Sequence, residues 1–293
     1  MANLKEVRNR IKSVSSTQQI TKAMKMVSAA KLKRATNAIV QLRPYATKLN
    51  EILTNLSSTL EEGVSVFTQE REVKKVLLVV ITSNRGLAGA FNMNVIKATN
   101  NLISAKYSAM HQNGNLSIIA IGKKAQDFYE KRQYNVLGNN NEVFNALTFE
   151  NVATITQSIM DAFVEGTYDK VEVVYNQFKN AGMQILTTEQ LLPVPKAVKS
   201  DKKENRTDYI LEPSQAEIVE QLIPKNIKLQ LYKAVLDSHA SEHGARMTAM
   251  DKATDNAGDL LKALKLSYNQ ARQAAITTEL SEIVSGAAAL SNG

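Results

Sequence analysis

The 293-residue sequence predicts an α/β protein in which long N- and C-terminal helices form an antiparallel coiled coil beside a compact α/β domain. Three observations support this fold class. Apolar or small residues recur in steps of three and four over the first 60 residues, and the end of the chain has the same repeat. Between these segments, apolar β-branched runs alternate with helical stretches, which is typical of a mostly parallel sheet.

The first coiled-coil helix is predicted over residues 1–62. Its seam contains one polar position, Gln18, among apolar or small residues: Leu4, Val7, Ile11, Val14, Thr21, Met24, Ser28, Leu32, Ala35, Ile39, Leu42 and Leu49. A 3.5-residue repeat sustained for about eight heptads favours a coiled coil over a globular helix. Pro44 is expected to kink this helix or to begin a second one.

The α/β domain is predicted over residues 70–195 and is expected to be Rossmann-like, with strands alternating with helices. Buried strands are expected at 76–83, 116–122 and 170–175, with an extended segment at 184–192. Helices are expected at 92–110, between the second strand and Gln133, and at 150–165. A polar, charged connector at 196–213 follows.

The second coiled-coil helix is predicted over residues 214–290. Ser214 and Glu217 have the spacing of a capping box, and Pro224 is expected to kink the helix or to mark a new start. The predicted seam is Met250, Ala253, Ala257, Leu260, Leu264, Tyr268, Ala271 and Ala275. The stretch 225–289 alone would form a rod of about 95 Å. Because such a rod is too long for the domain to bury, we expect it to pair antiparallel with the N-terminal helix.

The positive charge of the chain is concentrated in its first helix. The net charge is +8, and residues 1–60 alone carry eleven Lys or Arg against two acidic residues. Such a basic face predicts an anionic partner. The absence of cysteine excludes disulfides, thiolate zinc sites and thiol catalysis. No apolar run approaches the roughly 20 residues of a membrane helix.

Three short patterns raise alternative functions. The turn NRGLAG (84–89) lies where a phosphate-binding loop would lie, but it lacks the spacing of GxxxxGK or GxGxxG, so we prefer a tight strand-to-helix turn over a nucleotide-using enzyme. His239, Glu242 and His243 form H-x-x-E-H, but no other His is near in sequence, so we expect a solvated helix face and no metal.

The third pattern is the basic run KLKRA (31–35) with Lys22 and Lys25. It suits a nucleic acid, an acidic protein surface or a merely solvated face. Aromatic rings that would stack on bases are absent before Tyr45. Paired carboxylates and a Ser/His/Asp arrangement are not recognisable, so we expect no catalytic site and no cofactor.

Several longer motifs resemble the gamma subunits of F-type ATP synthases. They are RNRIKSVSSTQQITKAMKMVSAAKLKRA (8–35), RPYA (43–46), NRGLAGAFN (84–92), ARMTAMDKATDNAG (245–258) and AITTELSEIVSGAAAL (275–290). They occur in the family's order and cover nearly the whole chain. The resemblance implies a non-catalytic rotor shaft inside an α3β3 hexamer that performs the ATP chemistry. The implied partners are the α and β subunits, the epsilon subunit and the c-ring.

The resemblance also implies roles for individual residues. Met24, Lys25 and Arg246 should lie at the level of the acidic β-subunit tips. Arg272 and Gln273 should engage a β-subunit loop, with Thr277 and Glu279 as coupling residues nearby. Tyr209 and Glu212 match the foot that contacts epsilon and the ring.

The sequence departs from the family at two positions within the matching motifs. The family often has an acidic residue where this chain has Asn84, and some relatives have Glu where it has Lys25. The chloroplast-type cysteine insert is absent, and no mitochondrial presequence is evident. These features favour a bacterial enzyme, with the chain peripheral on the cytoplasmic face of the plasma membrane.

Overall fold

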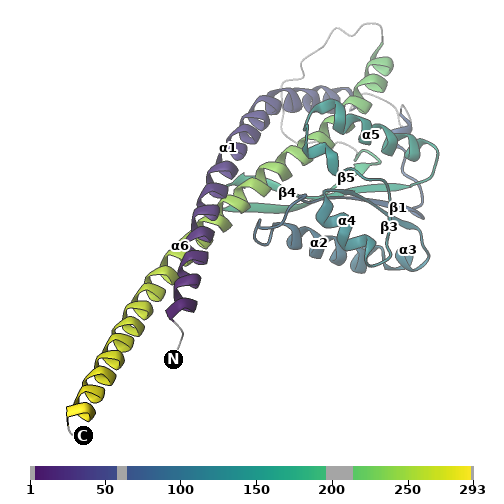
Figure 1. Cartoon of the computed structure of the whole chain (residues 1–293). Coiled ribbons are helices and arrows are strands. Elements are labelled where there is room, and N and C mark those ends of the chain that lie inside the picture. Colours follow the sequence, from purple (N-terminus) through teal and green to yellow (C-terminus); the bar gives the residue numbers. More distant parts are fainter. Residues whose placement is uncertain (1–3, 58–64, 196–213, 292–293) are drawn as a thin grey trace. The chain divides into compact units, whose positions relative to one another are not determined.

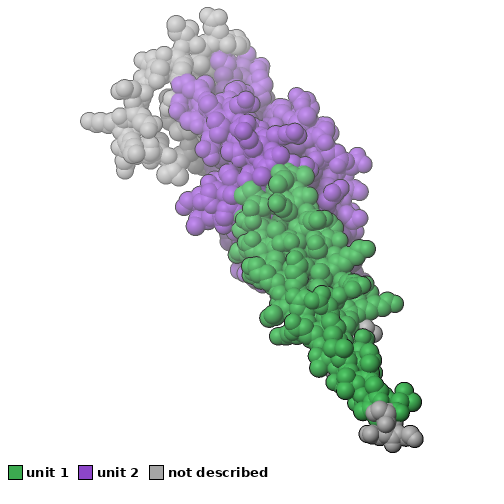
Figure 2. All heavy atoms as spheres, turned by 60° about the vertical axis from the view of Figure 1, so that its left-hand side comes forward, with its two compact units in different colours: residues 1–28, 247–293 green, residues 29–246 purple. Residues whose placement is uncertain are grey.

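The structure is a computed structural model that describes residues 4–57, 65–195 and 214–291. The chain divides into two compact units, unit 1 with residues 1–28 and 247–293 and unit 2 with residues 29–246 (Figure 2). Two long helices, α1 (Leu4–Ser57) and α6 (Gln215–Ser291), contribute residues to both units (Figure 1). The connector predicted at 196–213 lies outside the described residues.

Unit 2 is built on a five-stranded sheet of order β3-β2-β1-β4-β5. The strands are β1 (Val76–Ile81), β2 (Leu116–Ile121), β3 (Asn135–Val136), β4 (Lys170–Asn180) and β5 (Met183–Leu192). The first four run parallel, as predicted, and only the pairing of β4 with β5 is antiparallel. The segment predicted as extended near 184–192 is therefore the edge strand of the sheet.

The remaining elements of unit 2 alternate with these strands. Helices follow at α2 (Phe91–Lys106), α3 (Ser108–Gln112), α4 (Lys123–Glu130) and α5 (Phe149–Val164), with 3-10 turns at Val66–Thr68 and Asn141–Phe144. The single helix predicted at 92–110 is interrupted at Tyr107, whose backbone leaves the helical region at φ −124°. The rest of the predicted alternation is confirmed.

The sheet of unit 2 is covered on both faces. All six residues of β1 are buried, and so are all six of β2. Since successive side chains of a strand point to opposite faces of the sheet, both faces are covered. Leu77 and Val79 join the core that contains α5 and α6, whereas Val76 and Leu78 join the core of α2 and α4. A strand buried on both faces must be apolar throughout, which is why these runs lack polar alternation.

Both terminal helices pass through their prolines without ending. Pro44 lies inside α1 and Pro224 inside α6, so neither begins a new helix. The predicted N-cap of α6 is confirmed, since the Glu217 N–H donates to Ser214 Oγ at 3.3 Å.

Unit 1 consists of the beginning of α1 and the end of α6. Arg8 Nη2 donates to Tyr268 Oη at 2.8 Å, and Lys25 forms an ion pair with Asp251. Residue numbers rise along α1 while those of their partners fall along α6, so the two helices run antiparallel, as predicted.

A polar layer interrupts the apolar seam of unit 1. Gln18 Nε2 donates to the Thr254 carbonyl at 3.4 Å, and Thr254 Oγ1 donates to Thr21 Oγ1 at 2.8 Å. The expectation that Gln18 is a polar seam position is confirmed. Buried polar partners of this kind favour one register of a helix pair over its neighbours.

One predicted seam residue of α6 is wrong. Leu260 is 41% exposed, whereas Leu261 is 9% exposed and continues the stripe that passes through Ala257. Steps of three and four are both compatible with a helical stripe, and leucine occupies both positions, so the sequence alone could not separate them.

The end of α6 extends well beyond the part that pairs with α1. The stretch of α6 from Tyr268 to its last residue, Ser291, corresponds to about 35 Å of helix. The apolar side chains there are exposed within the chain: Ile276, Leu280, Ile283, Val284 and Leu290. Exposed apolar residues gathered on one segment indicate a surface that another molecule covers.

Two glycines of α6 provide a matched pair of substitutions. A Cβ on Gly244 would lie 3.0 Å from the Ala181 carbonyl oxygen, whereas a Cβ on Gly258 would lie 3.0 Å from Gln18 Nε2, the end of a flexible side chain. We expect Gly244→Ala to lower the free energy of unfolding by about 1 to 3 kcal/mol. Gly258→Ala should be neutral or stabilise by up to about 1 kcal/mol, because alanine favours helix. Urea unfolding followed by circular dichroism tests this, and equal effects would contradict it.

Candidate functional site

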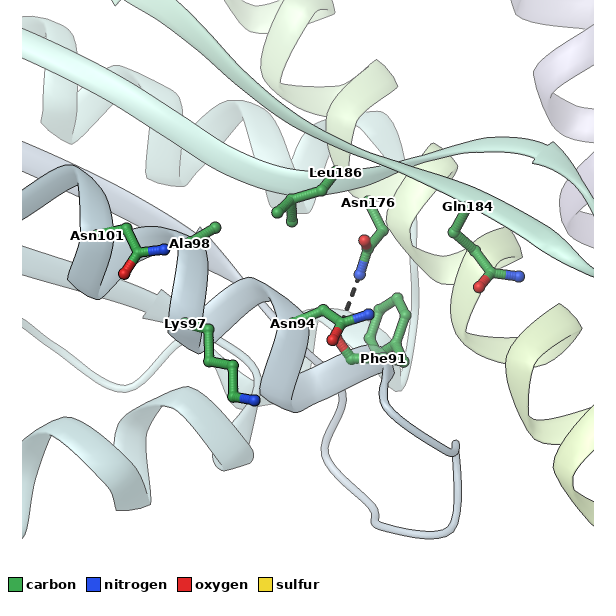
Figure 3. Close-up of a pocket in the computed structure, with 8 residues that line it drawn as sticks. All are labelled: Phe91, Asn94, Lys97, Ala98, Asn101, Asn176, Gln184 and Leu186. Atoms are coloured by element: carbon green, nitrogen blue, oxygen red, sulfur yellow. Dashed lines mark hydrogen bonds between the residues drawn. The ribbon is translucent and has the colours of Figure 1, made fainter.

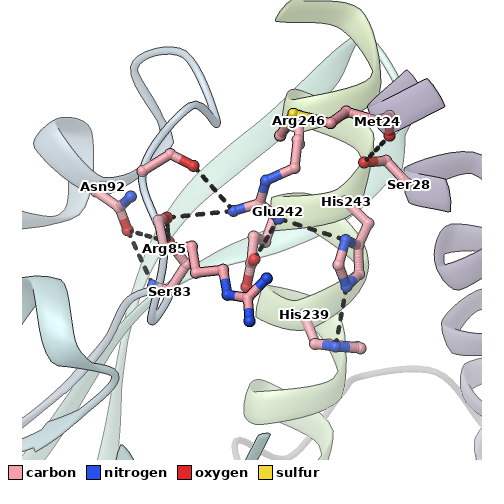
Figure 4. Close-up of polar contacts among 10 residues, drawn as sticks. Met24, Ser28, Ser83, Arg85, Asn92, His239, Glu242, His243 and Arg246 are labelled. Atoms are coloured by element: carbon pink, nitrogen blue, oxygen red, sulfur yellow. Dashed lines mark hydrogen bonds and ion pairs between the residues drawn. The ribbon is translucent and has the colours of Figure 1, made fainter. Parts of the chain in front are cut away.

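The turn after β1 presents carbonyl oxygens to α6. Arg246 Nη2 donates to the carbonyls of Arg85 and Gly86 at 3.2 and 3.3 Å (Figure 4). A phosphate at this position would need N–H groups that point toward it. The turn therefore suits a cation from its own chain and not a nucleotide phosphate.

The next possible phosphate site, the N-terminus of α4, is also occupied by the chain itself. The N–H groups of residues 123, 124 and 125 donate to Asn84 Oδ1, the Ser83 carbonyl and Thr82 Oγ1, at 3.0, 3.1 and 2.9 Å. A helix N-terminus attracts anions only through N–H groups that lack partners. This geometry favours the interpretation of the turn as structural.

The H-x-x-E-H pattern forms a buried polar cluster on α6, so the predicted solvated face is wrong. His239 Nε2 and His243 Nε2 lie 3.1 Å apart, and Arg246 Nη1 donates to Glu242 Oε1 at 2.5 Å. Glu242 and His243 are buried. The described part of the chain contains no group of three or more His, Cys, Asp or Glu placed to hold a metal ion. Glu242 thus neutralises an arginine in place of serving a metal.

Burial keeps both imidazoles neutral. It lowers the pKa of His239 to about 4, with Lys31 and Arg246 lowering it further. Burial also lowers the pKa of His243 to about 3, with contributions from His239, Arg246 and Lys31. Charged imidazolium is disfavoured in a low-dielectric site beside other cations. Neither histidine is therefore suited to acid catalysis at neutral pH.

The basic run of α1 remains exposed to solvent. Lys31, Lys33 and Arg34 are all exposed. Tyr45, the first aromatic residue of the chain, is 57% exposed and lies on the same helix. The run presents positive charge to solvent, which suits an acidic surface.

The residues implied by the family resemblance differ in their surroundings. Those near the end of α6 are exposed: Arg272, Gln273, Thr277 and Glu279. Met24 and Lys25 are half-buried, and Arg246 is 7% exposed. Tyr209 and Glu212 lie outside the described residues.

A small cavity of about 290 Å³ lies between α2 and the β4–β5 pair (Figure 3). Its polar lining is four neutral carboxamides and one cation: Asn94, Asn101, Asn176, Gln184 and Lys97. Asn176 Nδ2 is already used, since it donates to the Phe91 carbonyl at 3.3 Å. One lysine is a poor match for the charge of a di- or triphosphate.

Among the residues described, no helix is long and apolar enough to cross a membrane.

Comparison with known proteins explains these features together. The model of the ATP synthase family matches residues 3–290. The ATP synthase gamma chain of Flavobacterium psychrophilum is 60% identical over 291 residues, covering 99% of both chains. That of Cytophaga hutchinsonii is 55% identical over 295 residues, covering all of both chains. The chain belongs to the ATP synthase gamma family.

Chains in solved structures of ATP synthase central-stalk and rotor assemblies share the fold. A chain of the Tetrahymena thermophila mitochondrial ATP synthase central stalk and c-ring has a TM-score of 0.58 at 25% identity, covering 80% of this chain and 99% of its own. A chain of the Euglena gracilis mitochondrial ATP synthase rotor has a TM-score of 0.67 at 22% identity, covering 93% and 98%.

Asn84 and Lys25, the two positions at which a departure from the family was expected, both have partners in the structure. Asn84 uses both ends of its amide, since Nδ2 donates to the Asn141 carbonyl at 2.8 Å and Oδ1 accepts from the Lys123 N–H at 3.0 Å. A carboxylate could not donate in this way. Lys25 pairs with Asp251 inside unit 1.

Sequence reasoning missed two partners in this gamma-family chain. Asp251 was not identified as the partner of Lys25, because the register between two distant helices is not visible in either one. Glu242 was not identified as the partner of Arg246, although their i,i+4 spacing was a usable signal.

Proposed function

We propose that this chain is the central rotor shaft of a rotary ATP synthase, which couples ion-driven rotation of a c-ring to ATP synthesis or hydrolysis in an α3β3 hexamer. The carrying observation is the match of the whole chain to gamma chains at up to 60% identity. In this proposal the chain is not itself an enzyme, and the nucleotide chemistry belongs to the hexamer. Segments 1–62 and 214–290 form the shaft, 196–213 connects, and 70–195 forms the foot.

The shaft must be stiff along its axis and asymmetric around it. Paired helices in unit 1 supply stiffness, because seam residues such as Val7 and Ala257 are buried against the partner helix. Asymmetry arises since two unlike helices face three equivalent β subunits, each of which meets a different side of the shaft. The nucleotide affinities of the three subunits then differ at any moment.

The contacts that transmit torque must also break at each step. We propose that Met24, Lys25 and Arg246 act at the level of the β-subunit tips, and that Arg272, Gln273, Thr277 and Glu279 act deeper in the hexamer. The exposure of Arg272 and Glu279 supports this role, because exposed ion pairs contribute only about 0 to 1 kcal/mol and can exchange partners. The basic face of α1 would meet acidic β surface.

The foot and the location of the chain complete the proposal. Tyr209 and Glu212 are proposed to contact epsilon and the c-ring. The chain would then be peripheral on the cytoplasmic face of a bacterial plasma membrane, attached through the complex.

Co-purification tests the function as a whole. A tagged chain recovered from native membranes is expected to bring α and β subunits with it, and the isolated chain is expected to hydrolyse no ATP. Saturable nucleotide binding and turnover by the isolated chain would favour the enzyme alternative instead. Salt-dependent affinity for DNA, without α and β subunits, would favour a nucleic-acid binder.

The deep contact has its own test. Replacing Arg272 and Gln273 together by alanine should lower ATP-driven ion pumping by the reconstituted complex, up to about fivefold for each kcal/mol by which binding to the hexamer is weakened. Lys262→Ala is the matched control, since Lys262 is an exposed cation on the same helix that forms an ion pair with Asp259. Equal pumping by the two variants would remove Arg272 and Gln273 from the contact set.

A further inference from the structure

Helix α6 is held from one side by the turn between β4 and β5. Gly244 lies so close to Ala181 in that turn that an added Cβ would approach the Ala181 carbonyl oxygen to 3.0 Å and its Cα to 3.1 Å. One turn earlier, Ser241 Oγ donates to the Asn176 carbonyl at 3.0 Å. Backbone therefore lies against this side of α6, and it cannot rotate aside as a side chain would.

The same stretch of α6 is held from another side by the turn after β1. Arg246 reaches into that turn and donates to the carbonyls of Arg85 and Gly86 (Figure 4). Glu242 orients the guanidinium through Nη1, and His243 Nδ1 lies 3.5 Å from the same nitrogen. The guanidinium is thus fixed at both ends inside a buried cluster.

These two contacts lie on opposite sides of the helix. Successive residues of an α-helix are about 100° apart, so the Cα–Cβ directions at positions 244 and 246 differ by about 200°. Ser241 lies within about 60° of Gly244, and Glu242 within about 40° of Arg246. Close packing on one side and hydrogen bonds on the other restrain rolling of the helix more than contact on one side alone would.

The turn that Arg246 contacts is itself rigid. Ser83 Oγ donates to the Arg85 carbonyl at 2.6 Å, and the Ser83 N–H donates to Asn92 Oδ1 at 2.9 Å. Leu87 is held at a φ of 65°, a conformation that leucine rarely adopts. The backbone of this turn is therefore expected to transmit force with little deformation.

The two contacts lie at the end of the part of α6 that belongs to unit 2. Arg246 is the last residue of the helix in that unit, and Met247 is the first in unit 1.

We propose that Ser241, Gly244 and Arg246 form a torsional collar, in which the β1 turn and the β4–β5 hairpin hold α6 and prevent it from rolling in the α/β domain. Arg246 is then a positioning residue that acts on coupling through the β1 turn. This inference rests on the proposed rotor function. It has Arg246 act by holding α6 in place, a role that is compatible with the burial of its side chain.

Single-molecule rotation measurements test the collar. The complete complex is immobilised through its hexamer, a bead is attached to the α/β domain of the chain, and the angular fluctuations of the bead are recorded while catalysis is stalled. Arg246→Met, which keeps an unbranched apolar stem and removes the guanidinium donors, is expected to increase the angular variance at least twofold. Arg246→Lys, which keeps the charge but not the forked geometry, should give an intermediate increase.

Lys262→Met is the control and should leave the variance unchanged. An unchanged variance in assembled Arg246→Met complexes overturns the collar. A loss of pumping with unchanged variance also overturns it, and assigns Arg246 to direct contact with the hexamer. If Arg246→Met does not assemble, Arg246→Lys decides by the same criterion. A wild-type chain that does not assemble with α and β subunits would instead refute the rotor function itself.

Discussion

Replacing Gly122 with alanine is expected to lower the free energy of unfolding by about 4 kcal/mol, the range reached by severe clashes in a core. Gly122 joins β2 to α4 with a φ of 114°, and a Cβ there would lie 2.2 Å from the Thr82 carbonyl oxygen and 2.6 Å from its carbon. Thr82 belongs to the turn beside β1, and its Oγ1 also donates to the Gly122 carbonyl at 3.2 Å. Because the two nearest atoms are backbone atoms, they cannot rotate aside to make room. Chemical denaturation of the purified chain measures the decrease.

Gly114→Ala is the matched control. Gly114 also has a positive φ, 72°, but no atom lies within 4 Å of a Cβ built there. Gly114→Ala should therefore lower the free energy of unfolding only by the cost of holding alanine in the left-handed conformation, about 1 to 2 kcal/mol. If the two substitutions cost the same, the close approach of Gly122 to Thr82 does not limit stability.

The buried histidine pair is expected to make stability depend on pH. The pKa values of His239 and His243 are lowered to about 4 and about 3, against about 6.5 in an unfolded chain. Below pH 6.5 the imidazoles of the unfolded state therefore bind protons, whereas those of the native state stay unprotonated. Each histidine should remove about 1.4 kcal/mol of stability per pH unit between pH 6.5 and 4. Stability relative to a His239→Asn, His243→Asn variant should fall over this window, as measured by urea unfolding at several pH values.

Asp237 provides a control of opposite sign. Burial raises its pKa to about 6, against the lowering effects of Lys233 and Arg43. The native state then binds a proton near pH 6 that the unfolded state binds only near pH 4. Stability is therefore lost as the pH rises from about 4 to about 6, and the full loss is present above pH 6. Asp237→Asn should be more stable than wild type at pH 7.5, and the gain should vanish toward pH 4. A gain that does not change with pH would contradict this assignment, and so would a histidine difference that stays constant.

Much of the fold could be predicted because its signals are local. The runs at 76–83 and 116–122 are apolar throughout since strands buried on both faces have no solvent side. The seam from Val7 to Ile39 is visible because a helix repeats its buried face every three or four residues. The exposed residues Arg272 and Glu279 were identified only through resemblance to a family. No periodicity marks them.

The sequence by itself determined the element types, the parallel order of alternating strands and helices, and the concentration of positive charge on the first helix. Each of these depends on residues close together in the chain. Only the tertiary structure decided that Lys25 meets Asp251, that Leu261 and not Leu260 enters the seam, and that Glu242 and His243 are buried around Arg246. These outcomes depend on which distant surfaces meet, and a polar residue on a helix looks the same in sequence whether water or a buried arginine faces it.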